Sequence, residues 1–457
     1  MGRTKRKRRQ KKPRTYYLCD QQDNLVLLNT WLAKNEMRRN RKLCLAVFDD
    51  TGRGVLCKNK IQAGEELINL PLNLTLNVTT ILMDSIFCSI FLENKKQCLV
   101  EFEGSVSFQA LMAFYLSYLK SQGEDSHWYI YIQNLPKLYT VPYFLPNEAS
   151  QYIDSDILSV VSKQKDVIKM SFNIFEAILG SNVTETSNIK SFKKYFKLSI
   201  YEWAYFAVNT RCVYMDLSIV IDLKNIKNSI INLINDNTKI SLCPYLDMIN
   251  HSPNARNETK LVVSKNVENI SIDNLREDLF ADISFSIYTK NVFEMYSQVF
   301  ICYGDSHNLK LVTEYGFYLP NNELDYVSFD FDSIKEFFTT KNIKLSREQV
   351  SFINSHNLDK DLYIDLKGLS FNFYGLLMVV KYFYSQSDVS RLIYSAAICS
   401  TDKNLNDLIM PTVLDKANNI KMSLNVLENL EHRSVILNNC IALMYQYVNI
   451  LEKFIKC

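Results

Sequence analysis

Three short segments of the chain combine glycine, polar and aromatic residues in patterns that suit a small-molecule site. They are residues 51–55 (TGRGV), residues 247–252 (DMINHS), and Cys302-Tyr303-Gly304 followed by residues 315–317 (YGF). The paired glycines of the first segment allow a tight turn and close approach of the backbone to a ligand, although a plain turn is an equal interpretation. The segment is not a dinucleotide-binding loop, because the third glycine and the following helix of that motif are missing.

The second segment offers hydrogen-bonding side chains that act as both donor and acceptor. Asn250 and His251 have this capacity and follow Asp247 closely. Such side chains can bind the edge of a purine or tie two loops together, and from the residues alone the structural tie is favoured. A single histidine without a second one at ligand spacing predicts no metal site.

The third segment places a tyrosine at the end of a compact apolar run. Tyr303 follows residues 299–302 (VFIC) and precedes Gly304. A tyrosine in that position commonly satisfies its hydroxyl with the backbone of the core. The functional alternative is a hydroxyl that orients a reacting amine. The spacing from Tyr303 to Phe317 matches one turn, helix and strand, which would return the aromatic pair of residues 315–317 to the side of Tyr303.

A fourth residue, Arg211, stands out by its place on a predicted helix. Ile200, Trp203, Ala204 and Ala207 lie on one face, and Arg211 continues that face four residues after Ala207. A guanidinium on an apolar face requires a partner, because an unpaired buried charge is costly. That partner is either a protein carboxylate or a ligand carboxylate gripped by two parallel hydrogen bonds.

The elements that must position these residues alternate between strand-rich and helical stretches. Helical periodicity covers residues 24–37 and dominates 106–214, and strand patterns occupy 55–57, 67–70, 281–287 and 299–303. Past residue 324 the chain is mostly helical, and the periodicity from Leu427 to Ile455 predicts one long amphipathic helix in a bundle. The order predicts an α+β fold, with one helical block inserted into a sheet domain and another appended to it.

The charge is concentrated at the N-terminus. Residues 1–14 hold nine Lys or Arg and no acid, which leaves 43 basic against 49 acidic side chains in the remainder. The basic run in residues 3–14 predicts a nuclear address read by an import receptor or a contact with nucleic acid. The alternative is a solvated, disordered tail. We expect residues 1–20 to be disordered.

The cysteine pattern and the apolar stretches indicate the cellular compartment of the protein and whether it spans a membrane. The chain has 11 cysteines without a Cys-x-x-Cys, and its 5 histidines show no paired ligand spacing. These counts predict reduced thiols in an intracellular protein and no metal. Residues 368–380 are too short to span a membrane, and asparagine and glutamine interrupt residues 434–451. We therefore expect no membrane partner and a location in the nucleus, the cytoplasm or both.

The motifs in order resemble those of a known family. Arg53-Gly54-Val55, residues 61–71, residues 247–252, Tyr303-Gly304, Asn308 and residues 315–317 are similar to the motifs of SET-domain methyltransferases of the Rubisco large-subunit methyltransferase class. The likeness in motif order covers residues 20–330 and is architectural beyond that. It implies a β-clip SET domain over residues 21–324, with a helical insert at about 106–214. It also implies a helical substrate-binding domain over residues 325–457.

The resemblance also implies a cofactor and roles for individual residues. S-adenosylmethionine (SAM) would be the methyl donor, without a metal, and Tyr303 the catalytic tyrosine at the cofactor site. The remaining implied cofactor contacts are Gly52, Arg53, Gly54, Arg211, Asp247, Asn250, His251 and Phe317. Arg211 would hold the SAM carboxylate, and Phe317 would pack on the adenine. Some members carry arginine where this chain has Leu56, so one cofactor contact of the family is not matched.

The function that this resemblance implies is methylation of lysine side chains in proteins, histones or others. A second interpretation is a protein-histidine methyltransferase. A third is a non-catalytic SET-fold protein recruited to nucleic acid by its basic tail. Binding of SAM by the purified chain separates the third interpretation from the first two. Nothing in the sequence identifies the substrate protein, the number of methyl groups added or the oligomeric state.

Overall fold

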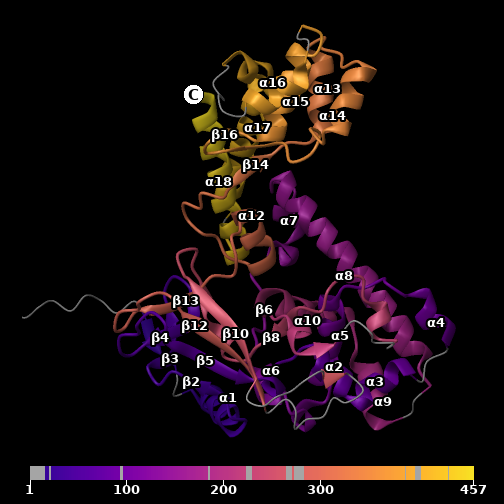
Figure 1. Cartoon of the computed structure of the whole chain (residues 1–457), viewed down its shortest axis with the longest axis vertical. Coiled ribbons are helices and arrows are strands. Elements are labelled where there is room, and N and C mark those ends of the chain that lie inside the picture. Colours follow the sequence, from indigo (N-terminus) through magenta and orange to yellow (C-terminus); the bar gives the residue numbers. More distant parts are fainter. Residues whose placement is uncertain are drawn as a thin grey trace, which may run out of the picture. The chain divides into compact units, whose positions relative to one another are not determined.

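In the computed structural model the chain forms two compact units (Figure 1). The structure describes residues 16–19, 22–92, 96–183, 186–222, 229–263, 270–271, 282–385, 388–396, 403–430 and 432–456. The first unit comprises residues 1–138 and 168–305, and the second comprises 139–167 and 306–457. Residues 306–324 thus group with the second unit, whereas the expected domain boundary lay at 324. The basic tail predicted at residues 3–14 lies outside the described residues, and its role stays a prediction.

The first unit holds two main sheets. One has the strand order β1-β3-β4-β13-β9, and the other has the order β10-β12-β5-β2. The bounds are β1 Tyr16–Leu18, β2 Arg38–Arg39, β3 Leu43–Phe48, β4 Gly52–Cys57, β5 Glu66–Pro71, β9 Asn250–His251, β10 Asn257–Val263, β12 Ile283–Thr289 and β13 Gln298–Ile301. The strands predicted at 55–57 and 67–70 are confirmed. Strand β1 lies within the stretch that was expected to be disordered, where it pairs with β3.

Helices pack beside these sheets and form most of the inserted block. They are α1 Asp23–Lys34, α2 Val78–Met83, α3 Ser85–Leu92, α4 Lys96–Glu101, α5 Phe108–Ser121, α6 Tyr129–Asn134, α8 Ser155–Ser181, α9 Ser187–Tyr195 and α10 Leu198–Arg211. Their core is aromatic: Phe114 of α5 stacks on Phe175 with ring centroids 4.4 Å apart, and Phe192 and Phe196 lie within 5.3 Å of it. The abundance of phenylalanine in the sequence therefore reflects packing in this block.

Two smaller pairs complete the sheets of the first unit. Strand β6 (Cys212–Tyr214) follows α10 directly and pairs with β8 (Ile240–Leu242), while β7 (Ile221–Asp222) pairs with β11 (Ile270–Ser271). The β6-β8 pair connects the end of α10 to the stretch that leads into residues 247–252. It thereby places Arg211 near that segment.

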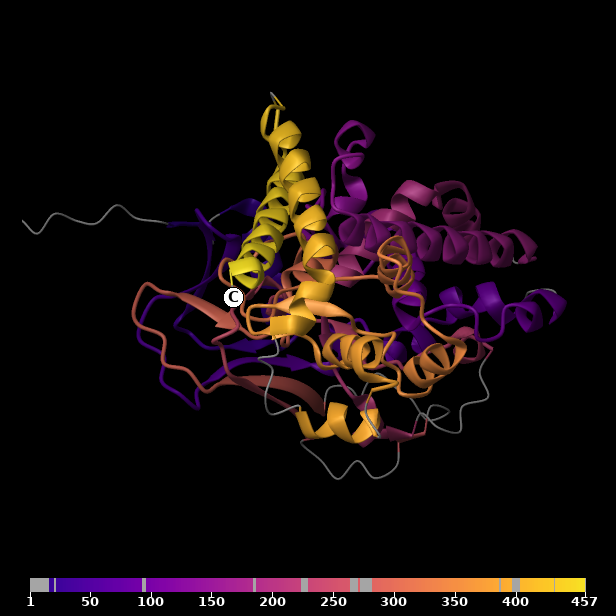
Figure 2. The ribbon, with the colours of Figure 1, turned by 90° about the horizontal axis from the view of Figure 1, so that it is seen from above.

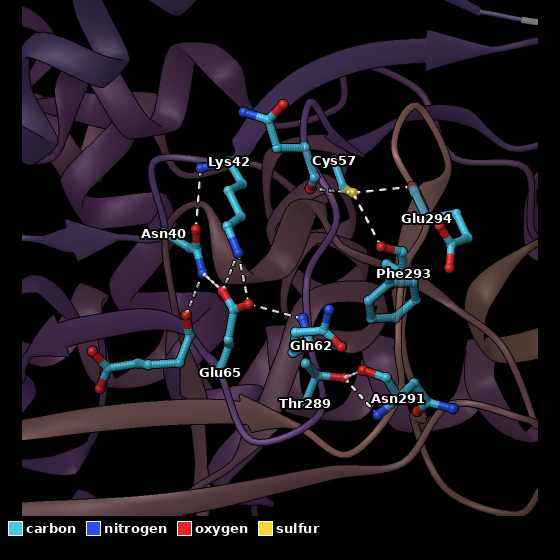
Figure 3. A network of polar contacts seen from close by, with 11 residues as sticks. Asn40, Lys42, Cys57, Gln62, Glu65, Thr289, Asn291, Phe293 and Glu294 are labelled. Atoms are coloured by element: carbon cyan, nitrogen blue, oxygen red, sulfur yellow. Dashed lines mark hydrogen bonds and ion pairs between the residues drawn. The ribbon is translucent and has the colours of Figure 1, made fainter.

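A polar network fixes the turn between β4 and β5 against the start of β3 (Figure 3). Glu65 accepts hydrogen bonds from Lys42 Nζ at 2.6 and 2.8 Å, from Asn40 Nδ2 at 2.9 Å and from the Gln62 N–H at 2.8 Å. The hydrogen bond from Lys42 is the main cause that lowers the pKa of Glu65 to about 2. Nearby, the Cys57 thiol donates to the Asn59 carbonyl at 2.9 Å. The network ties the turn before β5 to the residues that precede β3.

The second unit is mainly helical, with one small sheet. Its elements are α7 Asn147–Ser150, α12 Asn308–Lys310, the π-helical turn Leu311–Tyr315, β14 Tyr326–Ser328, α13 Phe331–Thr340, α14 Arg347–Ser355, β15 Tyr363–Asp365, β16 Gly368–Leu369, α15 Phe371–Tyr382, α16 Val389–Ala396, α17 Lys403–Glu428 and α18 Val435–Lys456. A continuous apolar cluster of these helices forms its core. Strands β14, β15 and β16 pair antiparallel in that order.

The prediction of one long helix from Leu427 to Ile455 was wrong. Helix α17 ends at Glu428 and α18 begins at Val435, and the two lie side by side (Figure 2). Ser434 causes part of the break, because its hydroxyl accepts the Leu437 N–H at 3.2 Å and so caps the start of α18. The apolar spacing continues across the break because both helices present apolar faces to one core.

None of the helices described is long and apolar enough to cross a membrane. Within the same residues, no group of three or more His, Cys, Asp or Glu side chains is placed to hold a metal ion.

Candidate active site

Strand β13 brings two of the predicted segments together in the first unit. It pairs antiparallel with β4 through Val299 and Val55, and parallel with β9 through Phe300 and Asn250 and through Ile301 and His251. The glycine segment, the Asn250-His251 segment and the strand that leads to Tyr303 are therefore neighbours in one sheet. Residues 250–251 thus lie beside the strand that leads to Tyr303.

Glycine suits each of the two glycine positions of β4 for a different structural reason. Gly52 has a φ of +69°, in the left-handed region that favours glycine. Gly54 is needed for close approach, because a Cβ there would lie 2.7 Å from Asn250 Nδ2 and 2.6 Å from Gln298 Nε2. Asn250 Nδ2 in turn donates to the carbonyls of Arg53 at 3.2 Å and Thr51 at 3.4 Å. The backbone of β4 is therefore open at Gly52, where a Cβ would meet no atom within 4 Å, and is covered at Gly54 by the side chains of Asn250 and Gln298.

Tyr303 is anchored to the β9 segment at two points. Its backbone N–H donates to His251 Nδ1 at 3.0 Å, and its hydroxyl donates to the Ile249 carbonyl at 2.8 Å. The two rings have centroids 5.2 Å apart. A phenol that donates one hydrogen bond has oxygen lone pairs that can also accept. The backbone anchor expected of a core tyrosine is therefore present, and it fixes the direction of the hydroxyl.

The contact with Tyr303 also determines the tautomer of the His251 ring. Because Nδ1 accepts an N–H, the neutral ring carries its proton on Nε2. Burial lowers the pKa of His251, and the Asp305 carboxylate opposes this in part. The imidazole is accordingly neutral at pH 7.

Arg211 ends α10 and pairs with a carboxylate of the predicted site. Its Nη1 donates to Asp247 Oδ2 at 3.1 Å and to the Asp247 carbonyl at 2.9 Å. The protein partner considered for Arg211 is therefore present. The Asp247 side chain is fully buried, and its Oδ1 makes no hydrogen bond with the described residues. Whether Arg211 also holds a ligand carboxylate stays a prediction.

Arg53 belongs to the same charged group through its side chain. Its Nη2 donates to the Asn134 carbonyl at 2.6 Å, at the end of α6. Burial lowers the pKa of Arg53, the positive charge of Arg211 lowers it further, and the Asp247 carboxylate raises it. Two guanidinium groups thus lie close to one carboxylate. Sequence reasoning considered only the backbone of Arg53 and missed this side-chain role.

Sequence reasoning also missed Tyr131, the other residue that holds Asp247. Its hydroxyl donates to Asp247 Oδ2 at 2.9 Å. The two residues are 116 positions apart, and Tyr131 lies in a short helix with one other tyrosine, Tyr129, and no motif. Nothing in the sequence singles it out.

Phe317 belongs to the second unit and follows a π-helical turn. Gly316 before it has a φ of +79°, and its carbonyl accepts hydrogen bonds from Thr140 Oγ1 at 2.7 Å and Asn439 Nδ2 at 2.8 Å. The rings of Tyr315 and Phe317 have centroids 6.2 Å apart. The predicted adenine contact of Phe317 stays a prediction. The other predicted site residues, Gly52, Arg53, Gly54, Arg211, Asp247, Asn250, His251 and Tyr303, all lie in the first unit.

Comparison with known proteins identifies sequences to which this chain is similar. No protein-family model matches the chain. It is 26% identical over 357 residues to SET domain-containing protein 4 of Artemia parthenogenetica, covering 78% of each chain. It is also 26% identical over 352 residues to ribosomal lysine N-methyltransferase set11 of Schizosaccharomyces pombe, covering 75% of this chain and 71% of that protein.

A more distant relative and a solved structure complete the comparison. The actin-histidine N-methyltransferase of Gallus gallus is 23% identical over 285 residues, covering 62% of this chain and 40% of that protein. The solved SET domain of LSMT bound to lysine and AdoHcy matches with a TM-score of 0.62 and 17% identity, covering 95% of this chain and 90% of that one. The resemblance found in the sequence is therefore confirmed: the chain has a SET fold like that of LSMT, and its sequence is related to that of SET domain-containing protein 4.

Proposed function

We propose that the chain is a SAM-dependent methyltransferase that modifies lysine side chains of proteins. The observation that carries this proposal is the anchoring of Tyr303, whose backbone and hydroxyl are both held by the β9 segment beside the backbone of β4. The names of the relatives support it, since one is a ribosomal lysine N-methyltransferase. The LSMT structure, bound to lysine and AdoHcy, supports the same class of substrate and cofactor.

The residues present fit the cofactor. A Cβ at Gly52 would meet no atom within 4 Å, so the backbone of β4 is open at that end, which suits a ligand lying against it. Two guanidinium groups around the single carboxylate of Asp247 leave an excess of positive charge, which suits the carboxylate of SAM. Asn250 and His251 carry hydrogen-bonding groups suited to its adenosyl part.

The chemistry divides between the cofactor and the chain. SAM, when bound, supplies a methyl group on a sulfonium sulfur. The sulfur is a good leaving group, so the transfer needs no metal. The chain must bind the cofactor, exclude water and present a neutral amine in line with the reacting bond. A lysine enters charged, and desolvation near aromatic side chains lowers its pKa and favours the neutral form. Tyr303 would orient that amine with its fixed hydroxyl.

The test is the substitution Tyr303→Phe. We expect turnover to fall at least about a hundredfold, because a group that orients the amine in the transition state is lost. Calorimetry should show SAM affinity within about twofold of that of the wild-type chain, a difference of less than about 0.5 kcal/mol. Unchanged turnover would contradict the catalytic assignment, and an unmodified chain that binds no SAM would contradict the proposed function as a whole.

A protein-histidine methyltransferase is the second candidate. The match to an actin-histidine N-methyltransferase supports it, although that match covers less of the chain. Incubation of the pure enzyme with candidate proteins and SAM, followed by mass spectrometry of the methylated peptides, separates the two. Methylation found on lysine supports the leading proposal, and methylation confined to histidine replaces it with the second.

A further inference from the structure

Tyr131 is a buried side chain with one polar atom, and that atom touches the candidate site. The residue has no exposed surface, and its ring packs edge-on against Trp128 with centroids 6.2 Å apart. Its hydroxyl donates to Asp247 Oδ2 at 2.9 Å. Burial is the main cause that raises the pKa of Tyr131 well above its usual value, and the Asp247 carboxylate adds to the increase. The phenol therefore keeps its proton and donates at neutral pH.

The carboxylate that Tyr131 contacts is held from one side only. Asp247 Oδ2 accepts from both Tyr131 and Arg211 Nη1, whereas Oδ1 makes no hydrogen bond with the described residues. A carboxylate can rotate about its bond to Cβ, and the hydrogen bond from Arg211 Nη1 contacts only one of its oxygens. The second hydrogen bond, from Tyr131, selects one orientation of the carboxylate. Together with the Asp247 carbonyl, which accepts from the same Nη1 at 2.9 Å, that orientation sets the direction of the Arg211 guanidinium.

The short helix that carries Tyr131 contacts the second arginine as well. Asn134 lies three residues after Tyr131, on the same side of α6, and its carbonyl accepts from Arg53 Nη2 at 2.6 Å. Its side chain donates to the Asn24 carbonyl at 3.3 Å and so connects α6 to the start of α1. Helix α6 therefore contacts one arginine directly and the other through Asp247.

We propose that Tyr131 is a positioning residue for cofactor binding: it fixes Asp247, which holds the Arg211 guanidinium in the direction that binds the cofactor carboxylate. This inference rests on the proposed function, since it takes SAM as the ligand of Arg211. Tyr131 itself touches neither the cofactor nor the reacting atoms. Its loss should accordingly weaken binding of the cofactor and leave the chemical step unchanged.

The substitution Tyr131→Phe removes the hydroxyl and keeps the ring. We expect the Kd for SAM, measured by calorimetry, to rise about tenfold, because one hydrogen bond to a charged group is lost and its effect reaches the ligand through Arg211. The kcat at saturating SAM and the KM for the protein substrate should stay within about twofold of the wild-type values, a difference of less than about 0.5 kcal/mol.

Tyr201→Phe is the matched control. Tyr201 of α10 is also fully buried in the first unit, and its hydroxyl donates to Ser171 Oγ at 2.8 Å, away from Asp247. A general loss of packing or stability would affect both variants alike. We expect the control to lower the melting temperature about as much as Tyr131→Phe does and to leave the Kd for SAM unchanged. An equal rise in Kd for both variants, or no rise for Tyr131→Phe, would overturn the inference.

Crystal structures of the cofactor-free chain provide a readout that does not depend on SAM. In the Tyr131→Phe variant we expect the Asp247 carboxylate to rotate and its distance from Arg211 Nη1 to change. The Tyr201→Phe variant should keep both as they are. If the wild-type chain binds no SAM, the proposed function fails, and these structures still decide whether Tyr131 positions Asp247. An unchanged Asp247 in the Tyr131→Phe structure would refute that role.

Discussion

Two buried aspartates, one in each unit, are held in opposite ways. Asp325 of the second unit is 1% exposed, and both of its oxygens accept from Asn308: Oδ1 from the backbone N–H at 2.6 Å and Oδ2 from Nδ2 at 2.7 Å. In the first unit, Asp247 accepts on Oδ2 from Tyr131 and Arg211, and its Oδ1 has no partner among the described residues. One carboxylate is satisfied on both oxygens, and the other on only one.

The difference separates a structural carboxylate from one suited to binding. Asn308 also forms two hydrogen bonds with the backbone of Leu319, so every polar atom of its side chain is used within the second unit. Burial raises the pKa of Asp325, although the hydrogen bonds from Asn308 oppose this. A buried polar atom without a partner is costly, and a functional role is one reason that a protein keeps it. Asp247, beside two arginines, fits that description.

The largest expected effect lies in the satisfied pair. Asn308→Ala removes a partner from Asp325 and both side-chain hydrogen bonds to Leu319, and we expect it to lower the free energy of unfolding by about 3 kcal/mol. Urea denaturation gives the value. Asn439→Ala serves as the control, because Asn439 makes a single hydrogen bond to the Gly316 carbonyl and should cost about 1 kcal/mol. Equal losses in the two variants would show that the Asn308 network is not special.

The next effect tests whether Arg211 serves binding. Arg211→Ala should weaken SAM binding by about 1.5–3 kcal/mol, as expected for a lost hydrogen bond to a charged group. Lys416 of the second unit is the matched cation, since its Nζ lies 3.7 Å from Asp156 Oδ2 and donates to the Ser328 carbonyl at 2.9 Å. Lys416→Ala should cost about 1 kcal/mol of stability and leave the SAM affinity unchanged. Wild-type affinity of the Arg211→Ala variant in calorimetry would refute its role.

Sequence periodicity predicted the parts of this comparison that depend on local pattern. It placed Arg211 on a helix face and predicted the strands at 55–57 and 67–70, because such patterns reflect burial along a single element. It could not reveal Tyr131, whose contact with Asp247 spans 116 residues. Strand β1 was missed for a similar reason: three residues form a strand only by pairing with β3.

The C-terminal helices and the site motifs show a second limit. Ser434 lies within the apolar repeat that predicted one helix, but a serine in such a repeat can equally cap a new helix. For individual motif residues the sequence allowed both a structural and a ligand-binding role. Only their contacts in three dimensions distinguish the two. Asn250, for example, donates to the backbone of the glycine segment across the sheet, 197 residues away in sequence. The family resemblance assigned both segments to one cofactor site, and composition alone would not have done so.

The smallest expected effect concerns Glu65, a carboxylate of the first unit that is satisfied as Asp325 is but near the surface. Its hydrogen bond with Lys42 lowers the pKa of Glu65 to about 2, against 4.5 in the unfolded chain. The stabilisation is therefore fully present above pH 4.5 and is lost as the pH falls through 2. The sign is opposite for Asp325, whose pKa is raised, so that its contribution is lost as the pH rises.

Glu65→Gln should consequently lower the free energy of unfolding near pH 7 by about 1 kcal/mol, a small value because the side chains of Glu65 and Lys42 are 26% and 33% exposed and solvent screens their interaction. Urea denaturation at several pH values should show this difference shrinking steadily below pH 4.5. Lys42→Met removes the other partner and should follow the same pH dependence. A difference that stays constant down to pH 2.5 would mean that the glutamine side chain destabilises the fold because it fits the site poorly. The charge of Glu65 would then contribute nothing to the stability of the sheet.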